Sequence, residues 1–143
     1  MPTKWKRPSL DTKFHIDYAW WQASGKDIRV AVRGQLCPEC QARFPDHRNT
    51  EAVDWVDPET AEVVEADALI QCLRSECAHK QGFISRNSLL VTNVFRLFLL
   101  NNNQSLTPRE LHEQMPWSDP DTILRTLVSG QVYMGIRPDN ESE

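Results

Sequence analysis

Two pairs of cysteines are the residues of this chain whose types and spacing could bind a metal ion. Cys37 and Cys40 enclose Pro-Glu, Cys72 and Cys77 enclose four residues, and 31 residues (41–71) separate the two pairs. Thiolate is a favoured ligand of structural zinc, which takes four ligands in a tetrahedron. Each short turn can present two sulfurs to one ion. The sequence therefore predicts that all four cysteines bind Zn²⁺.

Three other interpretations of the cysteines stay open. If one helix carries both Cys72 and Cys77, the two side chains point about 140° apart at roughly 100° per residue, and His79 then replaces Cys72 as the fourth ligand. A disulfide scaffold is disfavoured because four cysteines are few for 143 residues, and residues 1–13 lack the apolar run of a signal peptide. A redox C-x2-C motif would open a helix beside a βαβ unit, which the polar residues 46–51 do not supply. We therefore expect a reducing compartment.

The cysteine motifs also resemble a known family. Cys37-Pro38-x-Cys40 is followed by a long polar gap, Gln71-Cys72-x4-Cys77 and the aromatic Phe83. This order resembles the zinc-finger family of phage late-gene activators, the Ogr/Delta type, over residues 37–85. The resemblance implies a small zinc protein that acts in transcription by touching polymerase and DNA. It also implies that the same four cysteines are the metal ligands.

Composition limits the remaining possibilities. A chain of 143 residues with net charge −4 suits one domain or two very small ones. The longest apolar stretch, Leu89 to Leu100, is interrupted by Thr92, Asn93 and Arg96 and is shorter than the ~20 residues of a membrane span. We therefore expect a soluble, cytoplasmic protein. We also expect no small-molecule substrate.

Basic side chains are concentrated near the N-terminus. Residues 1–34 carry seven basic and three acidic groups, whereas residues 35–67 carry two and nine. Lysine and arginine bind the phosphates of nucleic acids by charge. A local nucleic-acid contact is therefore predicted for a basic arm, residues 1–13, and for one face of a strand expected over residues 28–36: Lys4, Lys6, Arg7, Arg29 and Arg33.

Alternating apolar residues predict strands in the first half of the chain. Phe14, Ile16 and Tyr18 alternate with polar residues, as do Ile28, Val30 and Val32. We expect a hairpin of residues 14–21 and 28–36, and a second, acidic hairpin of residues 53–56 and 61–64 around Asp57-Pro58. Residues 14–85 are thus predicted to form a β-rich, zinc-ribbon-like domain.

The second half has the periodicity of helices. A helix capped by Ser88 should run from Leu89 to Asn101; Thr107-Pro108-Arg109-Glu110 begins a second helix and Asp119-Pro120 a third. A strand over residues 132–136 follows, and residues 138–143 form an acidic tail. The order of elements over residues 88–137 resembles a winged-helix fold, and residues 86–137 are predicted to form this helical module. Its third helix begins with acidic residues, which disfavours DNA reading.

These patterns predict an α+β fold with a zinc-ribbon-like N-terminal half and a winged-helix-like C-terminal half. No nucleophile–base pair, phosphate loop or nucleotide fingerprint is recognisable, so an enzyme is not expected. The leading hypothesis is a zinc-stabilised accessory factor in transcription or another nucleic-acid transaction. It would act mainly through a protein partner, such as a polymerase or another large complex. The alternative is a structural or adaptor subunit of a larger assembly that never contacts nucleic acid.

Overall fold

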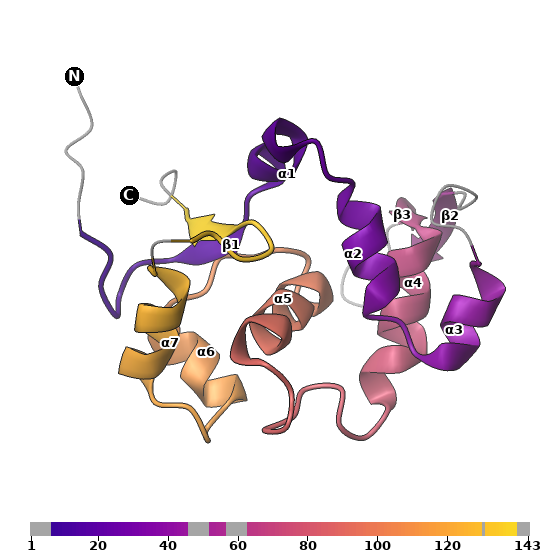
Figure 1. The fold of residues 1–143 in the computed structure, drawn as a ribbon. Coiled ribbons are helices and arrows are strands. Elements are labelled where there is room, and N and C mark those ends of the chain that lie inside the picture. The colour runs from indigo at the N-terminus through magenta and orange to yellow at the C-terminus, as the bar shows by residue number, and fades with distance from the viewer. Residues whose placement is uncertain (1–6, 46–51, 57–62, 130, 140–143) are drawn as a thin grey trace. The chain divides into compact units, whose positions relative to one another are not determined.

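The computed structural model of the protein consists mainly of helices (Figure 1). It describes residues 7–45, 52–56, 63–129 and 131–139, with residues 52–56 and 63–67 described at the level of the backbone. The chain divides into two compact units. One unit combines Met1–Trp21 with Ile84–Glu143, and the other is Gln22–Phe83.

The unit Gln22–Phe83 packs short helices beside a two-stranded hairpin. Its elements are α2 (Ile28–Gly34), α3 (Pro38–Arg43), β2 (Ala52–Val56), β3 (Val63–Asp67), α4 (Ala68–Ser75) and the 3-10 helix η2 (Cys77–His79). Helix α4 contacts α2, α3 and both strands. Its apolar face, with Leu69 and Leu73, is buried in this unit together with Val32 and Leu36. Helix α4 is therefore the central element of the unit that carries the cysteines.

The hairpin predicted for residues 14–21 and 28–36 is wrong. Only β1 (Phe14–Ile16) is a strand; α1 (Tyr18–Ser24) and α2 occupy the rest. The carboxylate of Asp17 accepts from the backbone N–H of Ala19 at 3.0 Å, and that of Asp27 accepts from Arg29 N–H at 2.9 Å. Each aspartate thus caps a helix start, which satisfies backbone donors that a strand would pair across a sheet.

The second predicted hairpin is confirmed at the level of its strands. β2 and β3 pair antiparallel from Ala52↔Asp67 to Val56↔Val63, and their connection lies outside the described residues. With helices on either side of this hairpin, the predicted α+β class with a β-rich, zinc-ribbon-like half is wrong. The fold is α-dominated, and strands in the described residues form two small two-stranded sheets.

The other unit joins the start of the chain to three helices from its end. These are α5 (Leu90–Leu100), α6 (Pro108–Gln114) and α7 (Pro120–Leu127), followed by β4 (Ile136–Pro138). β1 pairs antiparallel with β4, from Phe14↔Pro138 to Ile16↔Ile136. The side-chain amide of Asn103 accepts from Ile16 N–H at 2.8 Å and donates to Ile16 C=O at 3.0 Å. The first strand is thus an integral part of this unit.

The helix starts predicted at Thr107 and Asp119 are confirmed. Thr107 forms a capping box with Glu110, and Asp119 accepts from the backbone N–H of Thr122. The cap of α5 is instead Leu89, without a side-chain hydrogen bond, so the prediction of Ser88 is wrong. The strand predicted over residues 132–136 begins only at Ile136.

Side chains from both chain segments form the core of this unit. The fully buried residues include Phe14 and Ile16 from β1, Val94, Phe95 and Phe98 from α5, Leu111 from α6 and Ile123 from α7. Within the described part of the chain, none of the helices combines the length and apolar composition that crossing a membrane requires.

Candidate metal centre

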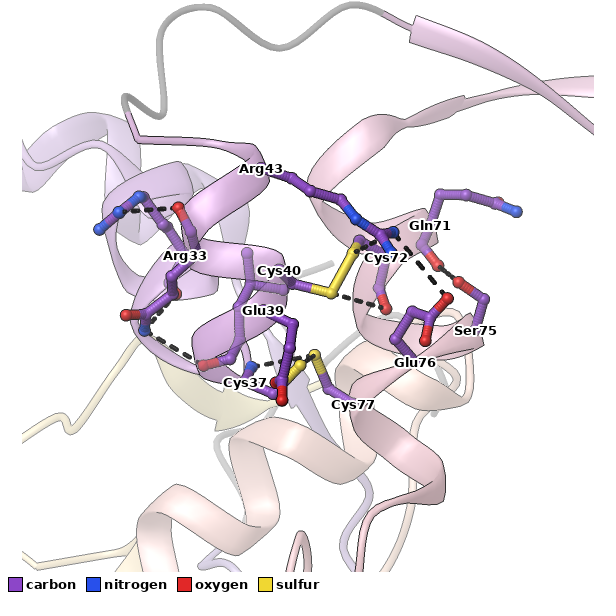
Figure 2. The surroundings of a disulfide bond; sticks show 12 residues. Arg33, Cys37, Glu39, Cys40, Arg43, Gln71, Cys72, Ser75, Glu76 and Cys77 are labelled. Carbon is purple, nitrogen blue, oxygen red and sulfur yellow. Dashed lines mark hydrogen bonds and ion pairs between the residues drawn. A yellow bond between two sulfur atoms is a disulfide. The ribbon is translucent and has the colours of Figure 1, made fainter.

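The first cysteine motif is positioned by the start of α3. Cys37 is the N-cap residue of this helix, Pro38 follows it, and Cys40 lies one turn inside with its side chain fully buried. Proline favours the first helical position because its fixed φ suits the helix and it has no N–H to leave unpaired. The C-x2-C motif is therefore a helix start that directs the Cys40 sulfur towards Cys72 of α4 and the Cys37 sulfur towards Cys77 of η2 (Figure 2).

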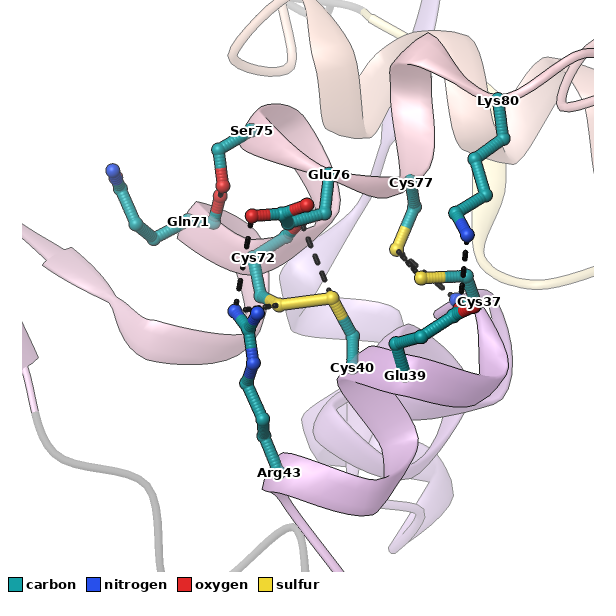
Figure 3. Close-up of polar contacts among 10 residues, drawn as sticks. All are labelled: Cys37, Glu39, Cys40, Arg43, Gln71, Cys72, Ser75, Glu76, Cys77 and Lys80. Carbon is teal, nitrogen blue, oxygen red and sulfur yellow. Dashed lines mark hydrogen bonds and ion pairs between the residues drawn. A yellow bond between two sulfur atoms is a disulfide. The ribbon is translucent and has the colours of Figure 1, made fainter.

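A break between two helices positions the second motif. Helix α4 ends at Ser75, and Cys77 begins the separate 3-10 helix η2. The predicted angle of about 140° between the side chains of Cys72 and Cys77 applies only if both residues lie on one continuous helix. Because the helix ends between them, both side chains lie on the side of the first motif (Figure 3).

The four sulfurs meet in one cluster. The Sγ atoms of Cys37, Cys40 and Cys77 all lie within 4.8 Å of one another, and Cys40 Sγ is disulfide-bonded to Cys72 Sγ. Cys37 Sγ and Cys77 Sγ lie 3.3 Å apart. In a zinc tetrahedron with bonds of about 2.3 Å, neighbouring sulfurs are about 3.8 Å apart. The cluster therefore lies within the range in which one metal ion can be bound.

The pairing across the cluster was not expected from the sequence. Cys40 of the first motif bonds to Cys72 of the second, and Cys37 of the first lies against Cys77 of the second. A disulfide uses up the thiolates of its two sulfurs, so four ligands are present only when this bond is reduced. The cluster as observed offers two thiols, Cys37 and Cys77.

Hydrogen-bond donors surround the sulfurs. The backbone N–H of Cys37 donates to Cys77 Sγ at 3.0 Å, and Arg43 Nη1 lies 3.8 Å from Cys72 Sγ. Lys80 Nζ forms an ion pair of 3.0 Å with Glu39, so a second cation is close by. Four thiolates around Zn²⁺ leave two net negative charges, which donors and cations of this kind stabilise.

Titration of the nearby groups follows from burial and ion pairing. Burial raises the pKa of the Cys77 thiol to about 11, so without a cation this thiol is protonated at neutral pH. Coordination to a metal ion deprotonates a thiol. The Lys80 side chain lowers the pKa of Glu39 to about 2 by its hydrogen bond, and this pair holds the start of α3 to the end of η2.

His79, the alternative fourth ligand, has a different environment from the cysteines. It is exposed at the end of η2, whereas Cys72 is buried and already bonded to Cys40. Neither His79 nor Cys72 belongs to the described group of three side chains whose ligand atoms lie within 4.8 Å, but Cys72 is bonded to Cys40, a member of that group.

The predicted nucleic-acid residues are divided between the two units, with Arg7 in one and Arg29 and Arg33 in the other. Lys4 and Lys6 lie outside the described residues, and Arg7 is exposed. Arg33 donates from Nε to Phe44 C=O at 2.6 Å and from Nη2 to Gln41 C=O at 3.3 Å, so it fastens the end of α3 (Figure 2). Two nitrogens of Arg29, Nε and Nη2, are inaccessible to solvent. Neither arginine thus presents its whole guanidinium group to a phosphate.

Arg43 and Lys80 lie beside the cluster but were not predicted as site residues. Arg43 lies in the last turn of α3, three residues after Cys40, and is 3.9 Å from Glu76 of the second motif. A basic residue one helical turn beyond a cysteine of the C-x2-C motif was the available signal. Lys80 is likewise a basic residue three positions after a cysteine, Cys77.

A second polar cluster lies in the other unit. The Ser105 hydroxyl donates to Asp139, and His15 Nδ1 lies 3.9 Å from the same carboxylate oxygen. In a serine nucleophile site the histidine contacts the serine and the carboxylate lies behind it. Here the carboxylate lies between the two, so the histidine is not placed to accept the serine proton.

Comparison with known proteins identifies no relative on which to base a family assignment. No family model matches the chain, and neither a curated protein nor a solved structure matches it. The resemblance to the phage activators over residues 37–85 therefore stays a prediction. The cysteine cluster is the feature from which a function can be argued.

Proposed function

We propose that Cys37, Cys40, Cys72 and Cys77 bind a structural zinc ion that joins α3 to α4 and η2. The observation that carries this proposal is the meeting of both motifs in one cluster, with three sulfurs within 4.8 Å and the fourth bonded to one of them. Zinc would hold together elements that share only a small core. In small domains the free energy of binding a structural metal contributes directly to the stability of the fold. The chemistry supplied is structural, because all four ligands come from the protein.

On this basis the protein acts as a zinc-stabilised, non-catalytic accessory factor. We place it in transcription or another nucleic-acid transaction, where it works mainly through protein contacts. The exposed Arg7 supports a local phosphate contact near the N-terminus. The acidic start of α7, with Asp119 and Asp121, opposes the use of that helix as a DNA reader.

The surroundings of Arg29 and Arg33 support the alternative function, in which the protein does not contact nucleic acid. Because Arg33 is fastened to two backbone carbonyls and Arg29 is partly buried, the predicted basic face is smaller than the sequence implies. The alternative is therefore a structural or adaptor subunit that contacts only protein.

Metal analysis under reducing conditions tests the zinc proposal. The reduced protein should carry about one zinc ion, and Cys72→Ser should lose most of it together with thermal stability. His79→Ala is the matched control, because it removes the alternative ligand from the same short segment; it should keep its zinc. Full zinc in Cys72→Ser with loss in His79→Ala would contradict the four-cysteine site.

Salt dependence separates the two functions. Phosphate contacts release counterions, so nucleic-acid binding must weaken steeply as salt rises. We expect a salt-sensitive retention of the full chain on single-stranded or duplex DNA that Arg7→Ala weakens. Tm measured for each variant is the control for folding. No retention at low salt would leave the adaptor function as the better account.

A further inference from the structure

We propose that the cysteine cluster is a site of oxidation by peroxide, at which zinc is exchanged for two disulfides formed crosswise between the motifs. The bonds are Cys40–Cys72 and Cys37–Cys77. This inference rests on the proposed zinc site and adds a reactive, reversible state to it. The oxidised cluster keeps α3 joined to α4 and η2 after the metal has left.

The geometry selects the partners. Cys40 and Cys72 are bonded across the motifs, and the sulfurs of Cys37 and Cys77 face each other at 3.3 Å. The backbone N–H of Cys37 points at Cys77 Sγ, which fixes this pair further. Both close pairs therefore connect α3 and its cap to the segment that contains α4 and η2, rather than closing the short turns within each motif (Figure 3).

Exposure indicates where the oxidant arrives. Cys37 is half-buried, whereas Cys40, Cys72 and Cys77 expose 0%, 5% and 1% of their surface. Peroxide attack needs a thiolate that solvent can reach, and zinc keeps the cysteine as a thiolate. Cys37 is therefore the sulfur that the oxidant reaches most readily, and Cys77 is the neighbouring thiolate that completes its bond.

The reaction balances with hydrogen peroxide as the named oxidant. The Cys37 thiolate attacks one peroxide oxygen; an S–O bond forms, the O–O bond breaks, and the departing hydroxide takes a proton to become water. The Cys77 thiolate then attacks the sulfenic sulfur, so that an S–S bond forms and the second hydroxide leaves as water. The same two steps, with peroxide attacked by Cys72, which exposes 5% of its surface, and the bond completed by Cys40, form the second disulfide. In total, four thiolates, two peroxides and four protons become two disulfides and four waters, and Zn²⁺ is released.

As a consequence of the two crosswise disulfides, the unit Gln22–Phe83 stays folded after zinc has left. Zinc and the crosswise disulfides close the same long connection, residues 41–71, so each constrains the unfolded chain in a similar way. Disulfides within the C-x2-C and C-x4-C turns would leave α3 and α4 unconnected. The pairing thus decides whether oxidation preserves the fold.

Disulfide mapping tests the pairing on the full, zinc-loaded protein. Trypsin cuts after Arg33, Arg43, Arg48, Arg74 and Lys80, which places Cys37 and Cys40 on one peptide and separates Cys72 from Cys77. After peroxide treatment and blocking of free thiols, we expect one species of three linked peptides, with fragmentation assigning Cys40–Cys72 and Cys37–Cys77. Linkage of the Cys72 peptide to the Cys77 peptide would overturn the inference.

Metal release and melting provide the second measurement. A chromogenic zinc chelator should record about one zinc released for two peroxides consumed. The oxidised, zinc-free protein should show a cooperative melting transition at a higher Tm than the reduced, zinc-free protein. Equal melting of these two forms would overturn the inference.

Paired variants provide the matched control. Cys37→Ser/Cys77→Ser should still form Cys40–Cys72 with one peroxide, and Cys40→Ser/Cys72→Ser should still form Cys37–Cys77. Mapping of the unaltered protein decides the pairing even if neither variant folds. If the reduced protein binds zinc but oxidation forms disulfides within each motif, only this inference is refuted. If the reduced protein binds no zinc, the proposed function and the exchange of zinc for disulfides are both refuted.

Discussion

At the scale of single residues, Gly135 has the least room for a side chain among the glycines that the structure describes. Its φ is +72°, and a Cβ built there would lie 2.5 Å from Trp21 Nε1. That indole nitrogen donates to Met134 C=O at 3.1 Å, so the ring cannot turn away without losing its hydrogen bond. The close approach ties α1 to the turn before β4.

We therefore expect Gly135→Ala to lower the free energy of unfolding by about 2–4 kcal/mol, from left-handed strain plus overpacking. Gly25→Ala is the control: its φ is +74°, but nothing lies within 4 Å of the added Cβ. It should lose only about 1 kcal/mol. Urea unfolding of both variants measures the difference, and equal losses would contradict the steric argument.

At the scale of elements, the start of α7 depends on one charged cap. The Asp119 carboxylate accepts from Thr122 N–H at 2.8 Å and from the Thr122 hydroxyl at 3.2 Å. The backbone hydrogen bond lowers the pKa of Asp119 below its ordinary value. A carboxyl group whose pKa is lower in the folded state stabilises the fold above its unfolded pKa of about 3.9, and this contribution is lost as pH falls through the folded pKa.

The cap predicts a pH-dependent difference between two variants. Asp119→Asn keeps a neutral acceptor at the cap, so its Tm should fall less than that of the unaltered protein between about pH 6 and pH 3. Asp119→Ala removes the acceptor and should have a lower Tm than Asp119→Asn at both pH values. Thermal melting monitored by circular dichroism checks this. An identical pH dependence in all three proteins would show that Asp119 does not titrate with folding.

At the scale of the whole molecule, the unit that contains α5, α6 and α7 is discontinuous in sequence. Its core includes Phe14 and Ile16, and β1 provides the partner of β4. Leu106, between α5 and α6, also forms a β-bridge with Phe14. The three helices therefore lack part of their core when the start of the chain is removed.

Truncation tests this dependence. A chain that begins at residue 22 should lose the cooperative melting transition of this unit, because three buried side chains, Phe14, Ile16 and Trp21, are missing. A chain that begins at residue 10 keeps β1 and should melt nearly as the full protein does. Far-ultraviolet circular dichroism against temperature measures both. Cooperative melting of the chain from residue 22 would show that α5, α6 and α7 fold alone.

The sequence by itself determined the local features whose signals lie within a few residues. The C-x2-C and C-x4-C spacings identified the side chains that the fold brings together, and Thr107-Pro108 and Asp119-Pro120 identified two helix starts. These predictions hold because a cap or a cysteine turn is defined by neighbouring backbone groups. The choice between Cys72 and His79 could not be made, because it depended on where α4 ends.

Only the tertiary structure decided between strand and helix for residues 18–34. Ile28 and Val32 are spaced by four and suit a helix as well as a strand; Val30 between them is 54% exposed, whereas Val32 is buried. The partner of β1 also lies far away, since Ile16 pairs with Ile136. The crosswise pairing of the cysteines has the same origin. Contacts between distant segments depend on how whole elements pack, and a pattern within one segment does not contain that information.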